Sequence, residues 1–242
     1  MIEQKAKFME IEIKNGKGII RLRHRNEFNQ QVFYIKNDAI ALDVHDGGGT
    51  MGRYFFLSGN INRNIVIEDI NRAMNNGEVS DLNEISDIIP SLLELFENGF
   101  YKISLGDFWR MFQRYVLMHI DFDHYYPPES LICFTQSETT INNARIEYYK
   151  RIIESGKRPI VILTDAEYSE GNQLLETHFF IVDGHHKILA YNQLGIEPRV
   201  LSITRRLVGL NEIDLEYFDQ DEKALNQLYN LSKKKASYGD YL

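Results

Sequence analysis

The sequence has a single cysteine and few prolines, and both shortages narrow what the chain can contain. Cys133 has no second thiol in the chain with which to form a disulfide bond, and CxxC zinc or redox motifs need at least two cysteines. The 5 prolines are scattered, and no low-complexity stretch marks a linker. We therefore expect neither a disulfide framework within the chain nor a cysteine-based metal centre.

Long apolar runs and an excess of basic residues are also missing. No run approaches the roughly 18 apolar residues that a membrane-spanning helix needs, and the first residues lack the basic-then-apolar order of a signal peptide. The chain has 27 lysines and arginines and 35 aspartates and glutamates, which gives a net charge of −8. Binding to nucleic acid requires a basic surface that neutralises phosphates. We therefore expect a cytoplasmic protein that does not bind membrane, and the charge disfavours non-specific nucleic-acid binding by the chain as a whole, although it leaves room for a local basic patch.

The first part of the chain shows the two-residue alternation that is typical of strands. The Asn15-Gly16 turn indicates a β-hairpin, and Asn37-Asp38 separates two further strands in the same way. The five expected strands lie at residues 8–13, 19–23, 31–35, 39–44 and 53–57. This pattern predicts an N-terminal region that is mainly antiparallel β-sheet.

Two later segments have the three- and four-residue apolar spacing of amphipathic helices. The first helix is expected over residues 81–96, with Pro90 in its first turn or at a kink and Gly99 after its end. The second is expected over residues 104–118, with a capping box at its start. Both helices are expected to be packing elements.

The second half of the chain alternates strands and helices, a pattern that predicts a parallel or mixed sheet. Its elements are expected as strands at residues 131–134, 159–163, 178–182 and 199–203, helices at 140–155 and 185–194, and a helical stretch from 221 to 235. The fold class predicted for the whole chain is α+β. Its parts are an N-terminal β-rich region with two helices (1–125), a C-terminal α/β domain (126–210) and a helical tail (211–242).

The stretch from Asp183 to Lys187 carries the clearest chemical signal. A buried strand is expected to end at Asp183, Gly184 permits a tight turn, and a helix begins at once. Backbone N–H groups and the positive end of the helix dipole then face the turn, an arrangement that binds anions. His185, His186 and Lys187 can donate to phosphate oxygens, and the Asp183 carboxylate can hold a magnesium ion or orient a histidine.

This stretch and its surroundings resemble the ParB/sulfiredoxin superfamily. The resemblance covers residues 130–205 and is carried by Val182-Asp-Gly-His-His-Lys, Ala190, Leu194-Gly195, Pro198 and Val200. Sulfiredoxins have a catalytic cysteine in the motif, and chromosome-partitioning members have Gly-Glu-Arg-Arg there and continue into a DNA-binding domain. The Asp-Gly-His-His spelling is most similar to the free-serine kinase branch. The resemblance therefore implies a ParB/sulfiredoxin-like fold and phosphoryl transfer.

The resemblance implies a nucleotide- and Mg²⁺-dependent phosphotransferase that acts on a small hydroxyl-bearing metabolite. It implies that Gly184, His185, His186 and Lys187 bind the nucleotide, which is ATP or ADP, with CTP as a further candidate. It implies that Asp183 is the catalytic motif carboxylate and a magnesium ligand, and that His186 also belongs to the catalytic set. No Walker A loop is present, so nucleotide binding is implied by the resemblance alone.

The resemblance also implies a catalytic base upstream of the motif. Glu138 lies between an expected strand and an expected helix, about where the family pattern places this acid before Pro159, and Glu129 is the fallback. An acid at a helix start also favours the helix dipole without any catalytic role. Lys187 stands where the family usually has arginine, and lysine binds phosphate as a point charge without a bidentate fork.

Other functions remain open for the same residues. One is a non-catalytic binding module that senses a nucleotide or anion and contacts a protein partner through residues 1–125. Another is a ParB-like nuclease, although the net charge of −8 and the lack of a basic stripe argue against it. The motif also fits an ordinary strand–turn–helix corner with surface histidines.

Two further stretches are weaker candidates. The run Asp46-Gly-Gly-Gly-Thr-Met-Gly52 can form a backbone nest for an anion, but a flexible turn between strands is the commoner explanation. Asp121, Asp123 and His124 can supply metal ligands, but no HxxxH or HExxH spacing supports a metal site.

Overall fold

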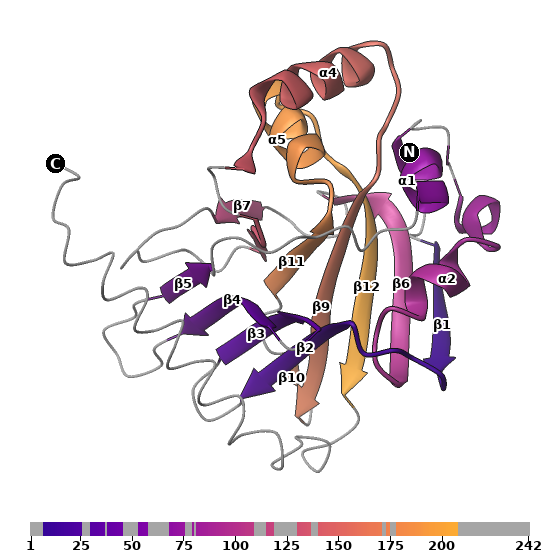
Figure 1. The fold of residues 1–242 in the computed structure, drawn as a ribbon, viewed down its shortest axis with the longest axis vertical. Coiled ribbons are helices and arrows are strands. Elements are labelled where there is room, and N and C mark those ends of the chain that lie inside the picture. Colours follow the sequence, from indigo (N-terminus) through magenta and orange to yellow (C-terminus); the bar gives the residue numbers. More distant parts are fainter. Residues whose placement is uncertain are drawn as a thin grey trace, which may run out of the picture.

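In the part of the chain that the computed structural model describes, strands form two β-sheets, and helices pack against the larger one (Figure 1). Strands and helices are both present and strands predominate, so the chain is an α+β protein, as predicted. The structure describes residues 7–25, 30–36, 38–45, 53–57, 68–75, 79, 81–108, 115–118, 130–136, 140–170, 173–174 and 178–207.

The larger sheet is mixed and has eight strands in the order β1-β6-β12-β9-β11-β8-β7, with β10 paired to β9 outside this path. The strands are β1 (Lys7–Ile13), β6 (Gly99–Asp107), β7 (Tyr115–Met118), β8 (Ser130–Cys133), β9 (Val161–Glu170), β10 (Gln173–Leu174), β11 (His178–Asp183) and β12 (Arg199–Leu207). β12 runs parallel to β9, and β7, β8 and β11 are parallel to one another, whereas the other pairs are antiparallel. Strands from both sides of residue 125 share this sheet, and the predicted division into domains stays a prediction.

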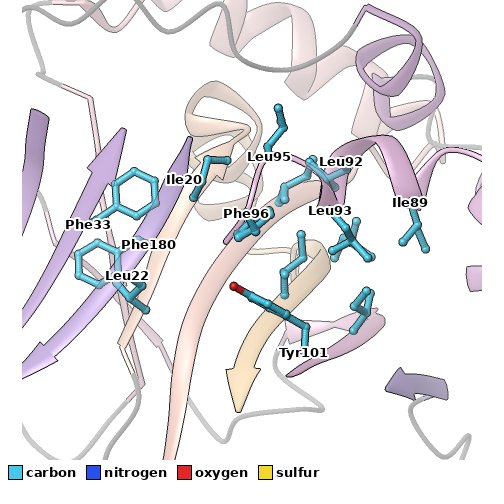
Figure 2. Close-up of a cluster of buried hydrophobic side chains, with 14 of the residues drawn as sticks. Ile20, Leu22, Phe33, Ile89, Leu92, Leu93, Leu95, Phe96, Tyr101 and Phe180 are labelled. Atoms are coloured by element: carbon cyan, nitrogen blue, oxygen red, sulfur yellow. The ribbon is translucent and has the colours of Figure 1, made fainter. Parts of the chain in front are cut away.

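The smaller sheet is antiparallel and has four strands in the order β2-β3-β4-β5. They are β2 (Ile20–Arg25), β3 (Gln30–Ile35), β4 (Asp38–His45) and β5 (Arg53–Leu57). The pairing of β3 with β4 confirms the second predicted hairpin. The two sheets meet where Phe33 of β3 stacks on Phe180 of β11, with ring centroids 5.6 Å apart (Figure 2).

The predicted hairpin at Asn15-Gly16 is wrong, because β1 pairs with β6 and β2 pairs with β3. Gly16 instead lies against the segment that precedes β6, where a Cβ atom would approach the Phe96 carbonyl oxygen to 2.3 Å. Its backbone N–H donates to Asn98 Oδ1 at 2.8 Å. Glycine is therefore needed here for close approach between two backbones and not for a turn between paired strands.

The helix predicted over residues 81–96 forms as two short helices. The helices in this part of the chain are α1 (Glu68–Asn75), the 3-10 helix η2 (Leu82–Ile85) and α2 (Ile89–Leu93). Asp81 caps η2 by accepting from the Asn83 N–H at 3.0 Å, and Pro90 lies in the first turn of α2, where its missing N–H costs no helical hydrogen bond. The apolar side chains of η2 and α2 pack into the core shared with both sheets (Figure 2).

The helix predicted over residues 104–118 is wrong at both of its ends. β6 continues to Asp107, and residues 115–118 form β7. Tyr101, Ile103 and Leu105 are buried with a period of two, and β6 is paired on both sides, with β1 and with β12. Pairing on both edges therefore outweighs the helical spacing of the apolar residues that follow. Gly99 begins this strand and does not end a helix.

The four strands and two helices predicted between residues 131 and 203 are confirmed. α4 (Asn143–Glu154) and α5 (His185–Leu194) join β8, β9, β11 and β12 in the predicted order (Figure 1). Successive residues of β11 enter different cores: Phe179 and Ile181 pack with α4 and α5, whereas Phe180 packs with the smaller sheet. The central strands are therefore buried on both faces, as their continuous apolar runs predicted.

No described helix has the length and apolar composition needed to span a bilayer. The tail helix predicted beyond residue 211 and the glycine run from Asp46 to Gly52 lie outside the described residues.

Candidate functional site

The strand–turn–helix corner predicted for Asp183 to Lys187 is confirmed. β11 ends at Asp183, α5 begins at His185, and Gly184 between them has a φ of 103° in the left-handed region. A Cβ atom on Gly184 would lie 3.2 Å from Val161 Cα. Gly184 provides no side-chain cap for α5. Glycine thus allows both the turn and close packing on β9.

Lys187 is bound to protein atoms in the interior. Its side chain is only 2% exposed, and Nζ donates to Asp183 Oδ2 at 2.8 Å and to the Ile160 carbonyl oxygen at 2.9 Å. The Asp183 side chain keeps 27% of its surface exposed. Lys187 therefore fixes the carboxylate and ties the first turn of α5 to the chain just before β9. Its predicted contact with a phosphate stays a prediction.

His185 is buried against the end of β8. Its Nε2 atom lies 3.2 Å from both the backbone nitrogen and Oγ1 of Thr135, and its ring packs edge-on against Phe134. The Thr135 hydroxyl donates to the Ile181 carbonyl oxygen at 2.5 Å, so the backbone N–H is the group that donates to Nε2. His185 therefore links the start of α5 to the chain that follows β8.

His186 is buried against the start of α4. Its Nε2 atom accepts a hydrogen bond of 3.0 Å from the backbone N–H of Asn142, the N-cap residue of α4. Burial lowers the pKa of His186, the positive charge of Arg145 lowers it further, and the negative charge of Asp183 opposes both. The ring is therefore held in its neutral form at neutral pH.

The second half of α5 is fixed to the sheet by Tyr191. Its hydroxyl donates to the Pro159 carbonyl oxygen at 3.1 Å, and the Arg158 guanidinium lies over its ring, 5.5 Å from the centroid. Burial raises the pKa of Tyr191 to about 12, although Arg158 acts in the opposite direction. Arg158 also pairs with Asp107 at the end of β6, at 3.0 Å. Side chains in the first turn and in the second half of α5 thus anchor the helix to the segments next to β8 and β9.

Glu138, the predicted catalytic base, lies outside the described residues, as do Glu129 and the Asp121 to His124 stretch. The described residues on either side of Glu138 are both held at the start of α5. Thr135 bonds to His185 before it, and Asn142 bonds to His186 after it. The role of Glu138 stays a prediction.

Arg145 is a candidate that the sequence reasoning missed. It lies exposed in the first turn of α4, where its backbone N–H donates to the Asn142 cap at 3.3 Å. A cation in the first turn faces the positive end of its own helix, which is electrostatically unfavourable. Its charge also acts on His186 at the start of α5. The only local signal was a basic residue three positions after an N-cap asparagine.

The predicted role of Asp183 as a magnesium ligand stays a prediction. No group of three or more histidine, cysteine, aspartate or glutamate side chains among them is arranged to hold a metal. One oxygen of Asp183 is already paired with the Lys187 ammonium group. Magnesium can be held by one carboxylate together with substrate phosphates.

Comparison with protein families, with curated proteins and with solved structures finds no match for this chain. The likeness to the ParB/sulfiredoxin superfamily therefore rests on the motif residues and stays a prediction.

Proposed function

We propose that this protein binds the phosphate groups of a nucleotide at the start of α5 and transfers a phosphoryl group to the hydroxyl of a small metabolite. The observation that carries the proposal is the start of α5, which follows Gly184 in a left-handed conformation and has no side-chain cap. The backbone N–H groups of a first helical turn and the positive end of the helix dipole suit phosphate oxygens. The phosphoryl-transfer step is supported by the resemblance of the motif.

Each residue at this corner has a role in the proposal. The backbone N–H groups at the start of α5 hold the phosphates, and Arg145 on the neighbouring helix supplies a cation next to them. Asp183, fixed by Lys187, orients groups at the reacting centre. The substrate hydroxyl oxygen attacks the terminal phosphorus, the bond to the bridging oxygen breaks, and the nucleotide leaves with that electron pair. The hydroxyl proton passes to a carboxylate, which the resemblance assigns to Glu138.

Arg145→Ala is expected to weaken nucleotide binding about tenfold, because one charge-assisted contact to phosphate is lost. Isothermal titration with ATP, ADP and CTP in magnesium buffer measures this effect. Arg151→Ala is the matched control, since Arg151 lies in the last turn of the same helix and is also exposed. A nucleotide that binds Arg145→Ala and the unaltered protein equally well would remove Arg145 from the site. No binding of any of the three nucleotides to the unaltered protein would overturn the proposal.

A second candidate is a binding module that senses a nucleotide without turning it over. The observation that favours it is that His185, His186 and Lys187 all bond to protein atoms in the interior. Side chains used in this way build a stable corner and leave fewer groups for chemistry. The two candidates are separated by incubating the protein with ATP or ADP and a set of hydroxy amino acids. A phosphorylated acceptor supports transfer, and saturable binding without product supports sensing.

A further inference from the structure

The two histidines of the motif make the same unusual kind of contact. Each uses Nε2 to meet a backbone N–H, that of Thr135 for His185 at 3.2 Å and that of Asn142 for His186 at 3.0 Å. A backbone N–H can only donate, so the Nε2 atoms must accept. An imidazole nitrogen that accepts carries no proton, so the His186 ring is neutral with its proton on Nδ1.

We infer that His186 is a positioning residue. Its hydrogen bond with the N–H of Asn142 holds the N-terminus of α4 against the start of α5, and this bond breaks when the ring is protonated. The hydrogen bond between His186 and Asn142 does not depend on any ligand. The consequence of this bond for nucleotide binding rests on the proposed function, because Arg145 lies three residues beyond Asn142. Loss of the hydrogen bond between His186 and Asn142 would move the Arg145 guanidinium away from the start of α5.

The charges around His186 favour release on protonation. Burial and Arg145 of α4 lower its pKa below the ordinary value of 6.5, and Asp183 of β11 raises it. Lys187, on α5 itself, is bonded to Asp183 and offsets that carboxylate. A protonated ring would present an N–H to the N–H of Asn142, beside Arg145 and at the positive end of the α4 dipole. Two donors cannot bond to each other, and the imidazolium would be repelled by both the guanidinium and the helix dipole.

The pH dependence follows from the direction of the shift. Because the pKa of His186 is lower in the folded protein than 6.5, the unfolded chain binds more protons at this residue in the range between the two values. The stability contributed by the hydrogen bond between His186 and Asn142 is therefore complete above pH 6.5. It is lost as the pH falls through the pKa that His186 has in the folded protein. Nucleotide binding at the start of α5 is expected to weaken over the same range.

The test is NMR of the full chain without nucleotide. Long-range proton–nitrogen spectra report the tautomer of His186, and amide hydrogen exchange reports the protection factor of Asn142. We expect the Nδ1–H tautomer at pH 7.5, and about a tenfold loss of Asn142 protection as the ring titrates. His186→Gln, whose side-chain oxygen can accept in place of Nε2, should keep the protection and lose its pH dependence. His186→Ala should lose the protection at every pH.

Two results would overturn the inference: an Nε2–H tautomer, or Asn142 protection that stays constant while the ring titrates. Full protection in His186→Ala would do the same. Asn142→Ala separates the effect of the hydrogen bond to His186 from that of helix capping, because it removes the capping side chain and keeps the backbone N–H. Nucleotide is absent from these measurements, so a failure of ATP to bind would overturn the proposed function alone.

Discussion

Asp183→Ala is expected to lower the free energy of unfolding by about 3–5 kcal/mol, the usual cost of removing one partner of a buried ion pair. The cost arises at Lys187, whose side chain is 2% exposed and would be left with only the Ile160 carbonyl oxygen as a partner. Urea denaturation followed by circular dichroism measures the change. A loss below about 1 kcal/mol would show that the ammonium group finds water or another partner.

A double-variant cycle shows whether the pair is the cause. Asp183→Ala combined with Lys187→Met removes the buried charge together with its partner, so the double variant is expected to be more stable than Asp183→Ala alone. Asp183→Asn is the matched control, because an amide oxygen still accepts from Lys187 Nζ, and it should lose less than half as much stability. These values also decide how binding data are to be interpreted, since an unfolded Asp183→Ala protein binds nothing.

Gly184→Ala is expected to lower the free energy of unfolding by about 2–4 kcal/mol, through two separate effects. A φ of 103° strains any residue that has a Cβ atom. The new methyl group would also press on Val161 Cα at 3.2 Å and on Lys187 Cδ at 3.3 Å. Because the backbone of β9 must move, the strain reaches the carbonyl of Ile160 to which Lys187 donates. Thermal and urea denaturation both measure the loss.

Gly195→Ala is the matched control for this substitution. Gly195 ends the same helix with a φ of 64°, but nothing lies within 4 Å of the position that a Cβ atom would take there. Only the conformational cost remains, about 1 kcal/mol. Equal losses at the two glycines would mean that the contact with Val161 adds nothing. A larger loss at Gly184 would reflect its more strained φ of 103° together with its close packing on β9.

Local patterns in the sequence predicted much of the second half of the chain. α5 begins and ends where predicted, at residues 185 and 194, because glycines in the left-handed conformation stand directly outside both ends. The strands were found because their apolar runs are buried on both faces, between the smaller sheet and the two helices. These sequence patterns depend only on residues close together in the chain. They predict the structure correctly where packing in the core favours the same elements.

Strand pairing was decided by the tertiary structure. Asn15-Gly16 has the composition of a hairpin turn, yet β1 pairs with a strand that begins at residue 99. The helical spacing after residue 104 was likewise overridden by pairing of β6 with β1 and β12. Nothing within a short window of sequence records which distant strand offers the better partner.

The site divides in the same way. Asp183 to Lys187 could be identified from the sequence, because a strand, a glycine and a helix in succession determine where the backbone turns and where the helix begins. The directions of the side chains could not be identified. His185 and His186 bond to residues 50 and 44 positions away, and Arg145 comes close to the motif only because α4 packs on α5. The sequence alone determines the backbone chemistry of the corner, whereas the partners of its buried polar groups are chosen by the whole fold, since each such group must find an acceptor or donor wherever packing places one.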